Sequence, residues 1–315
     1  MKANSITHKL FSSIPILILL GLISITIILI ISKPTLDRSP KNISKTSVTN
    51  GEHQEQLMID NNVRNYELVI PDSYPVSRSL PLLIALHGEN DTAASFIKAT
   101  RLLDYSNKQS FILAAPNSQS NWQDTTSDLN FISQLIDHLE SNYKVNPAQI
   151  SIVGFSAGGI MGYEVGCQLT SKISSLAVVA ANFKVSDYAN CQPNSSLPIS
   201  IINGSNDLVM PYNGGEINSM KLYGNITKTD ESVNLWFNNN NCSGDPNETM
   251  MAEDPTNNSH IEREDYSGCT PVISYQVING GHSWPGAHVV GEKGIINMSL
   301  NTTEILLNFF KNNYN

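Results

Sequence analysis

The sequence has few basic residues and no run of them. Of its 315 residues, 19 are lysine or arginine and 28 are aspartate or glutamate, which gives a formal net charge of −9 at pH 7. A protein that binds nucleic acid normally carries a basic patch or stripe. Nucleic acid is therefore not expected among the partners of this chain.

One stretch near the N-terminus has no charged residue at all. The run from Ile14 to Ile31 is mostly aliphatic and follows Lys2 and Lys9. This pattern is typical of a signal peptide or a membrane anchor, and about 18 apolar residues can cross a bilayer. We expect residues 1–33 to direct the rest of the chain out of the cytoplasm, as a secreted or periplasmic protein. If this segment is not cleaved, residues 14–31 hold the protein on the membrane; a buried core helix is the alternative.

Cysteine is scarce, and its spacing argues against common metal and redox motifs. The four cysteines, Cys167, Cys191, Cys242 and Cys269, contain no C-x-x-C pair, so we predict no metal site. An even number of cysteines behind an export signal indicates two disulfides. We predict the pairs Cys167–Cys191 and Cys242–Cys269, each of which closes a local loop. Four reduced, buried thiols are the alternative.

The remaining sequence divides into a polar segment and a large domain without internal repeats. Residues 34–60 have few large apolar side chains and are expected to form a flexible linker. From 61 to 315, apolar strands alternate with helical patterns, which predicts a mostly parallel sheet with helices on both faces. The strands are expected at 66–71, 81–88, 111–116, 150–153, 175–180, 197–203 and 272–278, and the helices at 92–107, 128–143, 231–238 and 299–311, with one more beginning near 160. Residues 239–268 are expected to form a surface excursion.

A G-x-S-x-G motif spans Gly154 to Gly158, between a predicted strand and a predicted helix. Strand, tight turn and helix form the context of a nucleophile elbow, which raises the serine hydroxyl above the edge of the sheet. The two glycines are needed because strand and helix pass too close for a Cβ atom. Ser156 is therefore the predicted nucleophile, and the N–H of Ala157 at the helix start is a predicted oxyanion donor. An ordinary glycine-rich turn is the alternative.

A serine nucleophile needs a base, and the base needs an orienting acid. In folds with this elbow, the acid and then the histidine follow the serine along the chain. Asp207 comes just after the strand at 197–203, and His282 lies in a glycine-rich loop after the last strand. We predict Asp207 as the acid and His282 as the base, against the alternatives of a turn aspartate and a structural histidine.

The strand at 81–88 ends in His87-Gly88, where a second oxyanion donor is expected. The backbone N–H of Glu89 is the first candidate for this donor and that of Asn90 is the second. His87 is expected to organise the loop rather than to take part in catalysis.

With these residues assigned, the chain resembles the polyhydroxybutyrate depolymerase-like esterases of the α/β-hydrolase superfamily, a group that includes feruloyl and acetylxylan esterases. The resemblance covers about residues 64–312. It implies an α/β-hydrolase fold, with Ser156, Asp207 and His282 as the triad, and it also implies the Cys242–Cys269 disulfide. No cofactor is expected. The motifs that carry it are Leu86-His87-Gly88, Asn121-Trp122, Asp128 with Phe131-Ile132, Gly154 to Gly159, Gly204 to Asp207 with Pro211 to Gly215, Trp236 with Cys242, and Gly280 to Gly286.

The predicted function is therefore that of a serine esterase. We expect it to hydrolyse small or oligomeric carboxylic esters, such as hydroxyalkanoate oligomers or feruloyl or acetyl esters, through an acyl-enzyme. Trp284 and Tyr212 are expected to form walls of the substrate site, with ordinary loop packing as the alternative. A serine peptidase of the same fold and a non-catalytic surface binding protein are the alternative functions.

Overall fold

The computed structural model describes residues 49–74, 77–217, 224–266 and 268–314. The signal or anchor segment predicted at residues 1–33 lies outside these residues. Among the residues that are described, no helix is long and apolar enough to cross a membrane.

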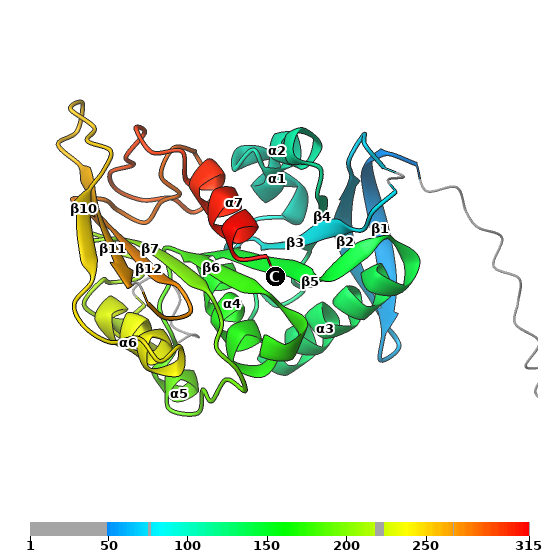
Figure 1. The fold of residues 1–315 in the computed structure, drawn as a ribbon, viewed down its shortest axis with the longest axis horizontal. Helices are drawn as coiled ribbons and strands as arrows, with labels where there is room; N and C mark the ends of the chain where they lie inside the picture. The colour runs from blue at the N-terminus through cyan, green and yellow to red at the C-terminus, as the bar shows by residue number, and fades with distance from the viewer. Residues whose placement is uncertain (1–48, 75–76, 218–223, 267, 315) are drawn as a thin grey trace, which may run out of the picture. The chain divides into compact units, whose positions relative to one another are not determined.

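A ten-stranded sheet with the order β1-β2-β4-β3-β5-β6-β7-β12-β11-β10 forms the centre of the described part (Figure 1). Its six middle strands are parallel to one another, and an antiparallel hairpin extends the sheet at each edge. The carboxyl ends of the parallel strands therefore lie side by side along one edge, at right angles to the edges that carry the hairpins. The strands are β1 (Gly51–Ile59), β2 (Asn62–Ile70), β3 (Leu80–Leu86), β4 (Ile112–Pro116), β5 (Val145–Phe155), β6 (Ser175–Val179), β7 (Ile199–Gly204), β10 (Asn247–Met250), β11 (His260–Tyr266) and β12 (Val272–Ile278). A separate two-stranded ribbon pairs β8 (Gly215–Glu216) with β9 (Asn225–Ile226).

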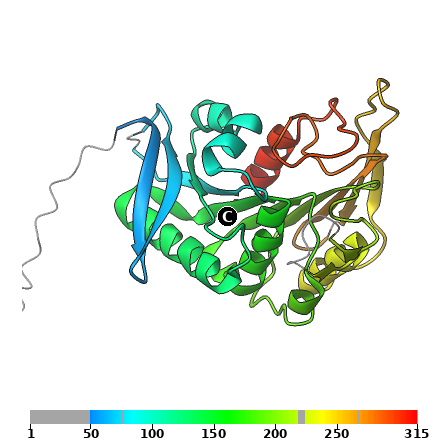
Figure 2. The ribbon, with the colours of Figure 1, turned by 180° about the vertical axis from the view of Figure 1, so that it is seen from behind.

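Helices cover both faces of the sheet, as Figures 1 and 2 show from opposite sides. One face carries α1 (Ala93–Ala99), α2 (Leu102–Gln109) and α7 (Thr302–Asn312). The other face carries α3 (Thr125–Asn142), α4 (Ala157–Gln168), α5 (Val185–Tyr188) and α6 (Thr229–Asn239). Alternate side chains of β3 enter two separate hydrophobic cores: Leu82 and Ile84 face one, and Leu83 faces the other. A sheet buried on both faces needs uniformly apolar strands, which confirms the predicted fold class.

The predicted linker at 34–60 is wrong over its last residues. Residues 51–59 form β1, which pairs with β2 through a two-residue turn at Asp60 and Asn61. Both turn residues have positive φ, 48° and 64°, as the common hairpin turns require. The sequence does not indicate this strand, because exposed and half-buried positions alternate along it and residues 52–56 are all polar.

The segment at 239–268 also differs from the expectation of a surface excursion. It contains β10 and β11, which continue the central sheet beyond β12. Their outer position explains the polar sequence, because an edge hairpin has little surface to bury.

Two disulfides connect elements of the domain in the predicted pairing. Cys167 of α4 is joined to Cys191, just beyond α5, and Cys242, just beyond α6, is joined to Cys269 before β12. Each crosslink closes a local loop, with sequence separations of 24 and 27 residues. The first therefore attaches the segment after α5 to α4, and the second attaches the segment after α6 to the loop before β12.

Candidate active site

Ser156 lies in a strained turn between β5 and α4. Its φ of 56° and ψ of −122° are unfavourable for a residue that has a Cβ atom. A Cβ atom on Gly154 would lie 2.2 Å from the carbonyl oxygen of Gly158, and one on Gly158 would lie 2.3 Å from that of Leu86. Both glycines are thus required for strand and helix to approach this closely, as the G-x-S-x-G motif predicts.

The structure brings His282 and Asp207 to this turn. The Nε2 atom of His282 lies 2.9 Å from the Oγ atom of Ser156, and its Nδ1 atom lies 2.7 Å from Oδ2 of Asp207. The side chains of His282 and Asp207 are 2% and 1% exposed. Because a carboxylate can only accept, Nδ1 carries the proton and Nε2 is left to accept from the serine hydroxyl.

Asp207 is itself fixed by its own loop. Its Oδ1 atom accepts hydrogen bonds from the backbone N–H groups of Val209 and Met210, both at 2.7 Å. The loops of the acid and the base also bind each other, since the N–H of Asn206 donates to the carbonyl of Gly280 at 2.8 Å. The carboxylate therefore presents its second oxygen to His282 without freedom to turn.

The loop after β3 lies beside the serine. A Cβ atom on Gly88 would lie 3.0 Å from the ring of Phe155 and 3.5 Å from Cβ of Ser156. The N–H of Asn90 is occupied by Oδ1 of Asn121, at 3.1 Å. Within the described ranges, the N–H of Glu89 has no hydrogen-bond acceptor. Of the two oxyanion donors considered for this loop, Glu89 thus remains available.

A pocket of about 270 Å³ opens above Ser156 and His282. Burial raises the pKa of the Glu89 carboxyl, and the positive charge of Lys293 partly offsets that rise. The pocket is also lined by Asn90, Val209, Val290 and Gly291.

No group of three or more His, Cys, Asp and Glu side chains could hold a metal ion, as far as the chain is described.

The substrate roles predicted for Trp284 and Tyr212 need correction. Trp284 is 1% exposed and packs edge-on against Phe96, with ring centroids 5.6 Å apart. Its ring belongs to the core beneath α1 and α7, where an indole buries a large apolar area. Tyr212 lines a different cavity, of about 350 Å³, together with Gln276. Neither ring lines the pocket that contains Ser156.

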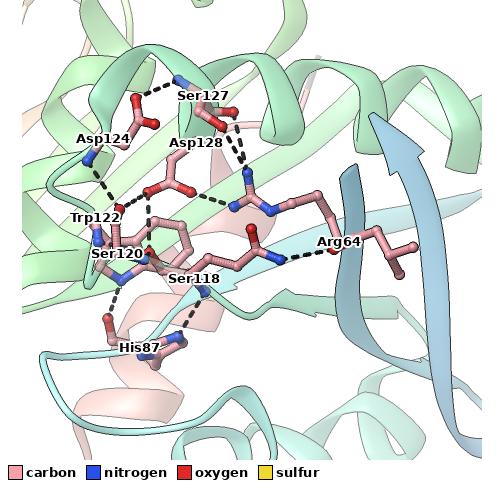
Figure 3. Close-up of polar contacts among 10 residues, drawn as sticks. Arg64, His87, Ser118, Ser120, Trp122, Asp124, Ser127 and Asp128 are labelled. Carbon is pink, nitrogen blue, oxygen red and sulfur yellow. Dashed lines mark hydrogen bonds and ion pairs between the residues drawn. The ribbon is translucent and has the colours of Figure 1, made fainter. Parts of the chain in front are cut away.

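A buried ion pair between β2 and α3 was not predicted. Arg64 of β2 pairs with Asp128 of α3, and each side chain is 2% exposed (Figure 3). The Arg64 guanidinium also lies 4.2 Å from the centroid of the Phe131 ring. The sequence contains a signal for this pair, because Arg64 stands at an inward-facing position of its strand, in register with Tyr66 and Leu68. A basic residue at such a position needs a buried acidic partner.

The sequence of this chain is similar to those of known esterases. A family model described as phospholipase/carboxylesterase matches residues 110–236. Feruloyl esterase C of Emericella nidulans is 26% identical over 253 residues, which are 78% of this chain and 83% of that protein. Feruloyl esterase B of Piromyces equi is 28% identical over 229 residues, 68% of this chain and 41% of that protein.

A solved structure shares the fold. The acetyl xylan esterase from Aspergillus awamori aligns with a TM-score of 0.59 at 14% identity, over 83% of this chain and 99% of that one. The family resemblance expected from the motifs is thereby confirmed. The chain is therefore similar to the feruloyl esterase-like α/β-hydrolases over most of its length.

Proposed function

We propose that this chain is a serine esterase that hydrolyses feruloyl or acetyl esters through a covalent acyl-enzyme on Ser156. The observation that carries the proposal is the continuous hydrogen-bonded series from Ser156 through His282 to Asp207. Relatives named as feruloyl esterases and an acetyl xylan esterase fold support the substrate class.

Each member of the series has a chemical role in this proposal. His282 accepts the Ser156 proton at Nε2 while Oγ attacks the ester carbonyl carbon. The C–O bond to the alcohol breaks as His282 returns that proton to the leaving oxygen. A water molecule, deprotonated by His282, then attacks the acyl carbon. The bond between the acyl carbon and Oγ breaks as His282 returns this proton to Oγ, which releases the acid and restores Ser156. Asp207 keeps the proton on Nδ1 and stabilises the imidazolium formed in both steps.

The oxyanion of each tetrahedral intermediate requires donors that are fixed in advance. We assign the backbone N–H groups of Ala157 and Glu89 to this role. Ala157 is the first residue of α4, where the helix leaves its N–H groups without acceptors. Loss of one such donor costs about 3 kcal/mol of transition-state stabilisation.

The pocket supports an acyl group of modest size. Val209 and Val290 supply apolar surface next to Ser156, while Lys293 supplies a polar one. A pocket of about 270 Å³ is at the small end of the range for small-molecule sites. An acetyl or an aryl acyl group fits this description better than a polymer chain does.

The two disulfides support a location outside the cytoplasm, because such bonds persist in oxidising compartments. The uncharged run at residues 14–31 supports export of the chain, either released or held on the membrane.

The test is a hydrolysis panel with the full chain and its Ser156→Ala variant. The panel contains methyl ferulate, p-nitrophenyl acetate, p-nitrophenyl esters of longer acyl groups and the anilide that matches the acetate. We expect turnover of the esters and not of the anilide, with a loss of about 10⁶-fold in kcat in the variant. Anilide turnover would favour the peptidase. Equal, negligible rates in both folded proteins would favour the binding protein.

A further inference from the structure

His87 is the residue whose contacts determine how the oxyanion loop is held. Its side chain is 1% exposed, at the end of β3. The ring nitrogen Nε2 lies 3.2 Å from the backbone nitrogen of Ser118. The other nitrogen, Nδ1, lies 2.7 Å from the carbonyl oxygen of Gly88. Both nitrogens are therefore used, and both bind backbone groups.

These two contacts leave one protonation state for the ring. The N–H of Ser118 can only donate, so Nε2 must be the acceptor and must lack a proton. The carbonyl of Gly88 can only accept, so Nδ1 must carry the proton. Burial lowers the pKa of His87 below its usual value, which favours this neutral ring.

The Gly88 carbonyl and the Glu89 N–H belong to the same peptide group. In a planar trans peptide these two groups point in opposite directions. A hydrogen bond that fixes the carbonyl thus also fixes the direction of the N–H. It also polarises the peptide and strengthens the N–H as a donor.

We propose that His87 is a positioning residue, which aims the Glu89 N–H at the oxyanion by donating from Nδ1 to the Gly88 carbonyl. The proposal rests on the proposed esterase function. His87 touches neither the nucleophile nor the substrate in this role, and it acts only through the Gly88–Glu89 peptide.

A second loop holds His87 in place from outside (Figure 3). The indole of Trp122 donates from Nε1 to the His87 carbonyl at 2.8 Å. The backbone N–H of Trp122 donates to the hydroxyl of Ser118 at 2.7 Å. That hydroxyl donates to Oδ2 of Asp128 at 3.1 Å. Asp128 in turn pairs with Arg64. A chain of polar contacts therefore runs from the buried ion pair to the oxyanion loop.

Two variants separate the nitrogens of His87. In His87→Asn the side-chain amide can still reach the position of Nδ1 and donate to Gly88, but the acceptor for Ser118 is lost. In His87→Gln the amide oxygen can reach the position of Nε2 and accept from Ser118, but the donor to Gly88 is lost. His138→Gln, at a half-buried position of α3 outside the pocket, is the matched control.

We measure kcat and KM for p-nitrophenyl acetate, and the rate at which a fluorophosphonate probe modifies Ser156. We expect His87→Gln to lose about 10- to 100-fold in kcat and in the modification rate at an unchanged KM, less than for outright loss of a donor. His87→Asn should keep kcat within about fivefold of the unmodified chain. Equal losses in both variants, or a change in KM alone, would overturn the proposal.

Nitrogen NMR of the unmodified protein tests the proposal even if a variant does not fold. It should report the proton of the His87 ring on Nδ1, and a proton on Nε2 would overturn the proposal. If the unmodified chain neither hydrolyses esters nor reacts with the probe, the proposed function fails as well. If it does both and the two variants behave alike, only the role of His87 fails.

Discussion

The Nε2 atom of His282 lies 2.9 Å from Oγ of Ser156, although 126 residues separate them in the sequence. The contact joins the loop after β12 to the turn after β5. In the sheet, β5 and β12 are separated by two strands, β6 and β7. Their parallel direction brings both carboxyl ends to one edge. The distance between nucleophile and base is therefore set by the sheet and not by local sequence.

Asp207→Asn should impair catalysis far more than folding. The asparagine amide nitrogen would face Nδ1 of His282, and the ring would then adopt the tautomer that cannot accept from Ser156. The side-chain oxygen could still accept from Val209 and Met210, as Oδ1 does now. We expect a loss of about 10⁴-fold in kcat with a small change in the urea midpoint.

The control for that variant is Asp245→Asn, since Asp245 is exposed and outside the pocket. It should leave kcat unchanged. A loss of less than about tenfold in Asp207→Asn would contradict the role of this carboxylate.

Asp128→Asn should destabilise the fold strongly. The substitution removes the charge that compensates Arg64 in a site where both side chains are 2% exposed. Loss of one partner of a buried pair typically costs about 3–5 kcal/mol. Urea denaturation followed by circular dichroism measures this cost. The double variant Arg64→Met/Asp128→Asn should recover part of it, because no unpaired charge remains.

A change of less than about 1 kcal/mol in the free energy of unfolding of Asp128→Asn would be typical of an exposed ion pair and would contradict a stabilising role for this buried one. A double variant less stable than the single one would point to the packing of Arg64 on Phe131 as the larger contribution.

The free energy of unfolding should decrease as the pH rises above the acidic range, because of the titration of Glu164 in α4. Burial, followed by the hydrogen bond and charge of Asp187, raises the pKa of Glu164 to about 7. The folded state therefore binds this proton more tightly than the unfolded chain, whose glutamates titrate near pH 4.3. Stability is lost as the pH rises from about 4.3 to above 7.

Glu164→Gln removes this titration and keeps a donor for Asp187. Between pH 5 and pH 8, the thermal midpoint should fall less in the variant than in the unmodified chain. The exposed residue Glu253 offers the control Glu253→Gln. Parallel pH profiles for Glu164→Gln and the unmodified chain would contradict the assignment.

The sequence predicts the parts of the site that depend on backbone crowding and strand order. Gly154 and Gly158 indicate a close approach of strand and helix, and the structure contains it. Asp207 and His282 follow predicted parallel strands, so their meeting at one sheet edge follows from topology alone. The two disulfide pairs follow from short spacing.

Features that depend on side-chain direction could not be predicted in the same way. A tryptophan next to the base is equally compatible with a substrate wall and with the core, and only the backbone of the loop turns Trp284 inward. The partner of Arg64 lies 64 residues away, on another element. The edge strand β1 has a half-exposed, polar sequence, which resembles a linker in composition.

Trapping of the acyl-enzyme tests the central claim most directly. The full chain is mixed with excess p-nitrophenyl acetate, quenched in acid within the first turnovers and digested for peptide mass spectrometry. We predict an acetyl group on Ser156 in the wild-type chain and none at this position in Ser156→Ala. Ester turnover with Ser156 unmodified, or an acetyl group on a different residue that accounts for the turnover, would contradict the account.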